Sequence, residues 1–164
     1  MSRNAQNATS LHKAAKKGYL DIVQFFIDQN CDSNVPGQNG GSPLHYAAED
    51  GHLPVVKYLT DEQGCNPSCL DDLNHTPLHL AAMKGHMDIV KLLTVEKQCD
   101  PMCKDSDQNT PLHNAAHSSH IDVVKFLTLK MHCDPMCRNS NQNTTLHLAA
   151  HKGYICRCCK VIHS

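Results

Sequence analysis

The chain has 164 residues, 40% of them apolar, which is enough to form a core and argues against an intrinsically disordered protein. Aromatic residues make up only 4% and Trp is absent, so the core must be built from aliphatic, Ala and Cys side chains, which favours thin, closely packed helices. The net charge of -1 provides no basic field for nucleic acid, and no apolar run approaches the roughly 18 residues that a membrane-spanning helix needs.

One seven-residue segment recurs along the chain and sets the order of the predicted elements. Its copies begin at Thr9, Ser42, Thr76, Thr110 and Thr144 and read TSLHKAA, SPLHYAA, TPLHLAA, TPLHNAA and TTLHLAA. Their Leu residues stand at positions 11, 44, 78, 112 and 146, so the successive spacings are 33, 34, 34 and 34 residues. A period of this length is typical of helical repeats, which bury their apolar faces by stacking on one another.

The third copy shows how the first helix of each unit is specified. Thr76 can cap this helix, because its hydroxyl accepts a hydrogen bond from an unpaired backbone N–H. Pro77 suits the first helical position, where a missing N–H costs nothing. Leu78 and the two Ala at positions i+3 and i+4 from it form one apolar stripe. Gly85 fits the left-handed conformation that ends a helix.

A second helix is predicted after each of these segments, with a polar turn leading to the next copy. In the third unit its buried side holds Ile89, Val90 and Leu93. The dipeptide Asp100-Pro101 prevents the chain from continuing as a helix. Repeats two to four carry one extra residue after this second helix, and we expect it in a surface loop, where insertions cost little.

The pattern resembles the ankyrin repeat, which has the same period and the same Thr-Pro-Leu-His signature. The resemblance implies an all-α solenoid of stacked helix-turn-helix units joined by extended, hairpin-like loops. It divides a single domain of residues 1–164 into five repeats, at about 4–35, 36–69, 70–103, 104–137 and 138–164.

The last repeat departs from the pattern after Ile155. Apolar and Cys side chains from there to Ile162 predict a short helix in a shifted register. The same segment supports an alternative function, zinc binding, because four possible ligands fall within eight residues: Cys156, Cys158, Cys159 and His163. In a further alternative, the chain is a fragment of a larger multidomain protein whose activity lies elsewhere.

Other Cys and His residues are interpreted as parts of the repeat. Three pairs have the spacing Cys-x3-Cys, and they recur with the repeat where ankyrin sequences usually have Ala: Cys65 and Cys69, Cys99 and Cys103, Cys133 and Cys137. Each Thr-Pro-Leu-His histidine stands where it can bond back to the helix cap. His113-x3-His117 has the spacing of a zinc-protease helix but lacks the Glu that serves as the base. We therefore expect no enzyme, no metal site and no cofactor.

Positions that differ between repeats are candidates for recognition. The resemblance places them at the loop tips, after Thr-Pro-Leu-His and before the helix-ending Gly, all on the concave side. An apolar centre with a charged rim is expected there. The predicted partner-binding residues are Tyr46, Glu49, Asp50, Leu73, His75, Leu80, Met83, Lys84, Asn114 and His117. The predicted function is a non-catalytic scaffold or adaptor module that binds another protein on this face.

The cellular setting follows from the Cys content and the polar N-terminus. Ten Cys without an apolar signal segment predict an intracellular chain with free thiols, in the cytoplasm or, alternatively, the nucleus. We expect a monomer that neither binds nucleic acid nor inserts into a membrane.

Overall fold

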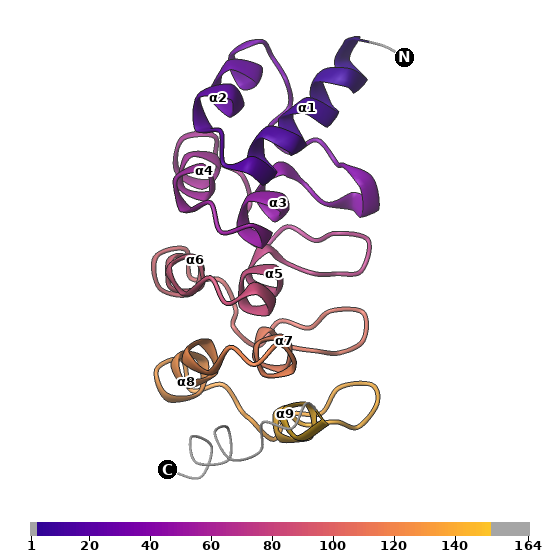
Figure 1. Ribbon diagram of the computed structural model, residues 1–164, viewed down its shortest axis with the longest axis vertical. Coiled ribbons are helices and arrows are strands. Elements are labelled where there is room, and N and C mark those ends of the chain that lie inside the picture. Colours follow the sequence, from indigo (N-terminus) through magenta and orange to yellow (C-terminus); the bar gives the residue numbers. More distant parts are fainter. Residues whose placement is uncertain (1–2, 152–164) are drawn as a thin grey trace.

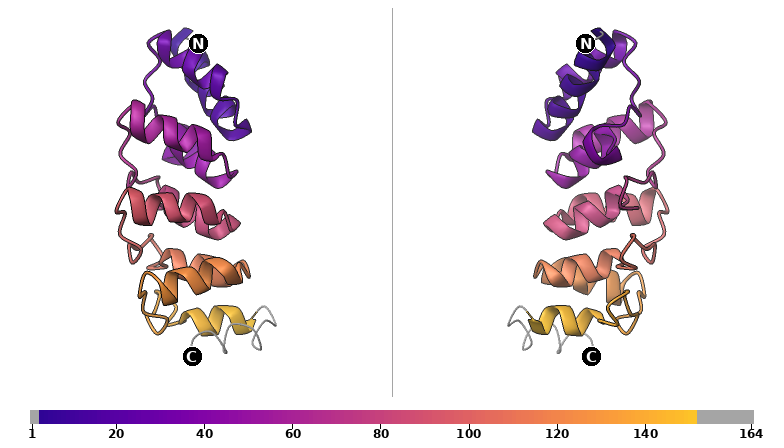
Figure 2. Two further views of the ribbon diagram at one scale, coloured as in Figure 1. Left: turned by 90° about the vertical axis from the view of Figure 1, so that its left-hand side faces the viewer. Right: turned by 90° about the vertical axis from the view of Figure 1, so that its right-hand side faces the viewer.

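The computed structural model describes residues 3–151, with side chains from Thr9 to Ala150, and forms an elongated stack of helix pairs (Figures 1 and 2). One column of the stack consists of the inner helices: α1 (Arg3–Lys17), α3 (Pro43–Glu49), α5 (Pro77–Lys84), α7 (Pro111–His117) and α9 (Thr145–His151). A second column consists of the outer helices: α2 (Leu20–Asp28), α4 (Leu53–Lys57), α6 (Met87–Lys91) and α8 (Ile121–Leu129). No strand forms within residues 3–151, so the predicted all-α solenoid is confirmed.

Extended loops precede the second to fifth inner helices and project to one side of the stack (Figure 1). Short 3-10 helix η1 (Gln38–Gly40) lies at the tip of the first loop. Neighbouring loops are joined by backbone hydrogen bonds, such as Asp72 N–H to the Asn39 carbonyl at 3.0 Å and Ser106 N–H to the Leu73 carbonyl at 2.9 Å. The concave face is the surface formed by these loops together with the exposed side of the inner helices.

Small and aliphatic side chains form the core between the two columns. Leu78, Ala81 and Ala82 of α5 are completely buried, as predicted for the apolar stripe of the inner helix. Ile89 and Val90 of α6 are also completely buried. The two Ala allow neighbouring inner helices to approach closely. No helix of the described residues is long and apolar enough to cross a bilayer.

The predicted helix ends are confirmed in the third repeat. Thr76 is extended and caps α5, which begins at Pro77 and ends at left-handed Gly85 with φ 79°. A Cβ atom at Gly85 would lie 2.3 Å from Nδ1 of His120, so packing against the following repeat also requires a glycine at position 85. Ser119 takes this position in repeat four and adopts the same strained conformation, with φ 66°.

Histidines at the starts of α3, α5 and α7 connect each of these helices to the loop that precedes the next inner helix. In His79, Nδ1 accepts from the Thr76 N–H at 3.1 Å, and Nε2 donates to the Asn109 carbonyl at 3.2 Å. His45 makes the equivalent bonds to Ser42 and to the His75 carbonyl. These partners require the neutral tautomer with its proton on Nε2. Burial lowers the pKa of His79 to about 4, since the charged ring would lose its hydration.

Two features differ from the sequence-based expectations. Helix α1 begins at Arg3, so Thr9 and Ser10 lie inside it rather than at its start. The extra residue of repeats two and three does not lie in a loop. It is accommodated by π-helical turns, η2 (Tyr58–Glu62) and η3 (Leu92–Glu96), which extend the outer helices. A π turn takes up one more residue because its backbone hydrogen bonds span five residues instead of four, as the Gln63 N–H to Tyr58 carbonyl bond does.

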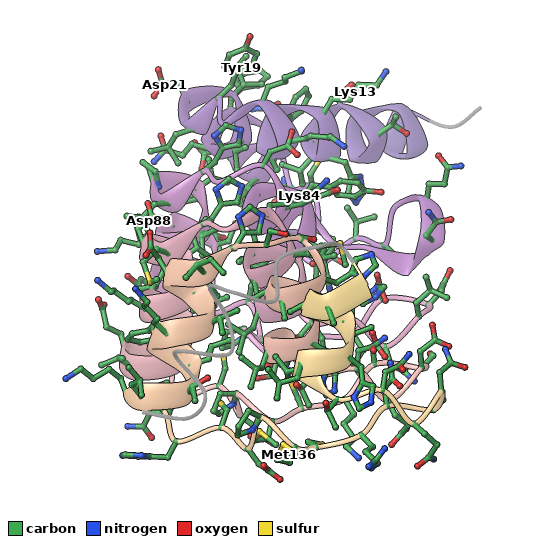
Figure 3. All side chains as sticks on the ribbon, turned by 60° about the horizontal axis from the view of Figure 1, so that its bottom comes forward. Lys13, Tyr19, Asp21, Lys84, Asp88 and Met136 are labelled. Atoms are coloured by element: carbon green, nitrogen blue, oxygen red, sulfur yellow. The ribbon has the colours of Figure 1, made fainter. Side chains whose placement is uncertain are left out.

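Exposed aromatic and aliphatic side chains lie on α2 at the N-terminal end of the stack. Tyr19, Ile22 and Phe25 are exposed, whereas Val55 and Tyr58, which correspond to Ile22 and Phe25 in the next repeat, are buried. Figure 3 shows Tyr19 directed away from the remaining repeats. The apolar positions that are buried on the second helix of repeat two are therefore exposed to solvent on the second helix of repeat one.

A pair of proline substitutions tests where the first and last inner helices begin. Thr145 occupies the first position of α9, and its buried hydroxyl lacks a partner among the described residues. We expect Thr145→Pro to raise the free energy of unfolding by about 1 kcal/mol. Ser10→Pro, at the same repeat position but inside α1, should lower it by about 3 kcal/mol.

Urea denaturation followed by circular dichroism measures both changes. A neutral or stabilising Ser10→Pro would show that α1 begins later than Arg3. A destabilising Thr145→Pro would show that the α9 start differs from the Pro-initiated starts of α3, α5 and α7.

The neutral state of His79 also predicts how stability depends on pH. Its folded-state pKa of about 4 lies below the ordinary value of 6.5, so the unfolded chain binds the proton more readily. Stability should be fully present above pH 6.5 and decline as pH falls toward 4. Between pH 7 and 5.5, His79 alone should contribute a loss of about 1 kcal/mol.

His79→Gln should flatten this part of the profile, although it also lowers stability at pH 7 by weakening the helix cap. Urea titrations at four or five pH values measure the slope. A variant slope equal to that of the parent would show that His79 is not the responsible group.

Candidate partner-binding face

Three positions at or just after the inner helices of repeats one to four carry side chains that differ from repeat to repeat. They are the residue after Thr-Pro-Leu-His and the two residues before the helix-ending Gly position. In order along the stack these are Lys13, Lys16 and Lys17, then Tyr46, Glu49 and Asp50, then Leu80, Met83 and Lys84, then Asn114, His117 and Ser118. Figure 3 labels Lys13 and Lys84 among them and shows Asp88 with the outer helices. The scaffold thus displays a different set of side chains in every repeat.

Tyr46 lies at the centre of the N-terminal half of this face. Its hydroxyl donates to the Gln38 carbonyl at 2.9 Å, which connects α3 to its own loop. Its ring contacts that of His12 edge-on, with 5.3 Å between centroids. The Lys16 ammonium lies 5.8 Å from the ring centroid, within reach of a cation–π interaction. These contacts orient the ring and leave it half-buried.

Glu49 links three repeats through its carboxylate. One oxygen lies 3.8 Å from the Lys16 ammonium and the other lies 3.5 Å from the Lys84 ammonium. Both lysines are well exposed, so each pair contributes no more than about 1 kcal/mol. The three side chains nevertheless place a positive, a negative and a positive charge in successive repeats along the stack.

Two hollows open on this face. The smaller, of about 110 Å³, lies between α3, α5 and their loops and is lined by Gln38, Asn39, Gly41, His45, Tyr46, Glu49, Asp71 and Leu80. The larger, of about 600 Å³, lies between α1, α3 and the first loop and is lined by Thr9, His12, Lys13, Lys16, Val35, Pro36, Gly37, Gln38 and Tyr46. Three of the predicted residues therefore meet at the smaller hollow, whereas Tyr46 is the only one that reaches the larger.

The remaining predicted residues have varied surroundings. Leu73 is exposed at a loop tip, and His117 is exposed on α7. His75 is largely buried and lies between two carboxylates, with Nδ1 3.1 Å from Asp71 and Nε2 3.6 Å from Asp105. It therefore stabilises the stacked loops and offers little surface to a partner.

Asn114 also offers little surface. Only 8% of it is exposed, and its Nδ2 lacks a hydrogen-bond partner among the described residues. The predicted partner-binding surface is consequently narrower at repeat four than the sequence indicates.

The paired cysteines lie at the contacts between repeats. The Cys65 and Cys99 thiols donate to the carbonyls of Ser33 and Pro67 in the preceding repeats, at 3.8 and 3.7 Å. Burial raises the pKa of Cys103 to about 11, which keeps its thiol protonated at neutral pH. This placement supports their interpretation as packing residues.

Metal ligands do not gather in the described part of the chain. No group of three or more His, Cys, Asp or Glu side chains is arranged there to hold a metal ion. The alternative zinc cluster at Cys156 to His163 and the predicted shifted helix lie outside the described residues.

Comparison with protein families agrees with this architecture. A family model described as ankyrin repeats (3 copies) matches residues 1–71 and again 60–139. The chain belongs to the ankyrin-repeat family. Ankyrin repeats generally act as protein–protein interaction modules. Comparison with curated proteins found no match.

Membership of the ankyrin family leaves the recognition residues to be found in the chain itself, because one scaffold serves many partners. Gln38 stands at one of the variable loop tips, outside the final set of predicted partner-binding residues, and it lines both hollows. Its role depends on the loop folding back toward α3, and the sequence offers no local signal for this contact.

Proposed function

We propose that the chain is a non-catalytic intracellular scaffold or adaptor that binds a partner protein on its concave face, around Tyr46, Leu80 and Met83. The observation that carries this proposal is the pair of adjoining hollows between the inner helices and the loops, which are open to solvent and share Tyr46. Concave surfaces with an aromatic centre and a polar rim suit the burial of a partner side chain.

The charges around this centre support the same proposal. Glu49 lines the smaller hollow together with half-buried Leu80 and is paired with Lys16 and Lys84, an arrangement that resembles the apolar centre and charged rim of a protein interface. The exposed Lys84 and His117 continue the polar rim from the third repeat to the fourth. A stable complex needs on the order of 800 Å² on each side, and a surface spanning several repeats can supply it.

Charge substitutions test the proposal. We expect Leu80→Glu and Met83→Glu to weaken binding of the native partner at least tenfold, because each places a carboxylate in the apolar centre. Quantitative affinity capture from a cell extract identifies proteins retained by the parent chain, and the purified partner then gives dissociation constants.

Val95→Glu is the matched control, since it introduces the same charge at an exposed apolar residue of η3, outside the concave face. Circular dichroism tests whether Leu80→Glu, Met83→Glu and Val95→Glu keep the helix content of the parent chain, as we expect. A partner that is retained equally by Met83→Glu, or lost equally from Val95→Glu, would place the binding surface elsewhere.

A further inference from the structure

The two hollows of the concave face carry opposite charges. The larger is lined by Lys13 and Lys16 and by no Asp or Glu, so it is named the basic hollow. The smaller is lined by Glu49 and Asp71 and by no Lys or Arg, so it is named the acidic hollow. They share Gln38 and Tyr46 and therefore adjoin each other along the stack.

The basic hollow combines its charge with an apolar wall. Val35, Pro36 and the Tyr46 ring line it, and its volume of about 600 Å³ is large enough for a bulky side chain. Lys13 is exposed and makes no ion pair with any described residue. An arriving carboxylate can pair with this ammonium without displacing an existing partner.

The acidic hollow has the opposite preference. Glu49 is contacted by Lys16 and Lys84 on its two sides. One Asp71 oxygen accepts from the His75 N–H at 2.8 Å and the other lies 3.1 Å from His75 Nδ1, so this carboxylate holds the loop in place and Glu49 is the acidic group nearest to an arriving cation. At about 110 Å³, this hollow accepts the end of a long side chain rather than a ring.

Resting on the proposed function, we infer that the concave face binds an extended segment of the partner that carries an acidic and an apolar residue for the basic hollow and a Lys or Arg for the acidic hollow. The segment is extended because the two hollows follow one another, between α1 and α3 and then between α3 and α5. Because the basic hollow is followed by the acidic hollow, the segment can bind in only one direction along the stack. A reversed segment would place like charges together. A polyanion does not fit, because Glu49 and Asp71 would repel it.

Random 12-residue peptides displayed on phage provide the probe. The parent chain should select sequences that combine Asp or Glu, an apolar residue and Lys or Arg in one fixed order. Synthetic versions of the selected peptides should bind Lys13→Glu at least tenfold more weakly than the parent. Their affinity for the parent should fall as salt is raised from 50 to 500 mM.

Two controls accompany this selection. Lys125→Glu makes the same charge reversal at an exposed residue of outer helix α8 and should leave peptide affinity unchanged. Glu49→Gln removes the charge of the acidic hollow and should relax the selection for Lys or Arg while retaining the selection for an acidic residue. Circular dichroism checks each variant for folding.

The possible outcomes separate this inference from the proposed function. Selected peptides without acidic residues, equal affinity for Lys13→Glu and the parent, or no enrichment at all would each overturn the charge pattern. If the selected peptides, or the native partner, still bind Met83→Glu more weakly than the parent chain, the concave face remains the binding surface. If neither Met83→Glu nor Lys13→Glu weakens peptide or partner binding, both the inference and the proposed function fail.

Discussion

The hydrogen bonds of the Thr-Pro-Leu-His histidines fasten the starts of α3, α5 and α7 to the loops that precede the next inner helices. His45, His79 and His113 each accept at Nδ1 from the cap of their own inner helix and donate from Nε2 to a carbonyl in the loop that precedes the next inner helix. A buried, fully paired ring of this kind is costly to remove, because its partners would lose their hydrogen bonds at buried or partly buried positions. The helix start, the loop position and the stacking of two repeats thus depend on one side chain.

This arrangement explains how the same scaffold can carry a varied surface. The residues that make the stack are buried and repeated, as Leu78, Ala81 and Ala82 show, whereas the concave-face positions differ from repeat to repeat and most of them are at least partly exposed. Side chains as different as Lys13, Tyr46 and Leu80 can therefore occupy one repeat position. Recognition then depends on how side chains from neighbouring repeats combine, as in the two hollows that share Tyr46.

The repeat pattern predicted most of the fold because each signal is local. The cap at Thr76, the start at Pro77 and the end at Gly85 each depend on the conformational preferences of one or two residues. The α1 start was missed because residues 3–10 contain neither Pro nor Gly to prevent the helix from extending. The π turns were missed because a single inserted residue does not reveal whether the helix or the loop takes it up.

The binding face was predicted only in part, since it depends on contacts between repeats. Tyr46, Glu49 and Leu80 come together as expected, but the burial of His75 between Asp71 and Asp105 depends on how two loops stack. The larger hollow likewise requires the first loop to lie opposite the extended α1. Neither arrangement is encoded within one repeat.

The histidine bridges can be observed directly by NMR. Long-range ¹H–¹⁵N correlation of the full chain at pH 7 reports which ring nitrogen carries the proton. The account predicts that His45, His79 and His113 are fixed in the tautomer protonated at Nε2 and that the His79 signal persists at pH 5.5. Averaged tautomers at these three rings, or protonation of His79 near pH 6.5, would contradict the bridging role on which the stack depends.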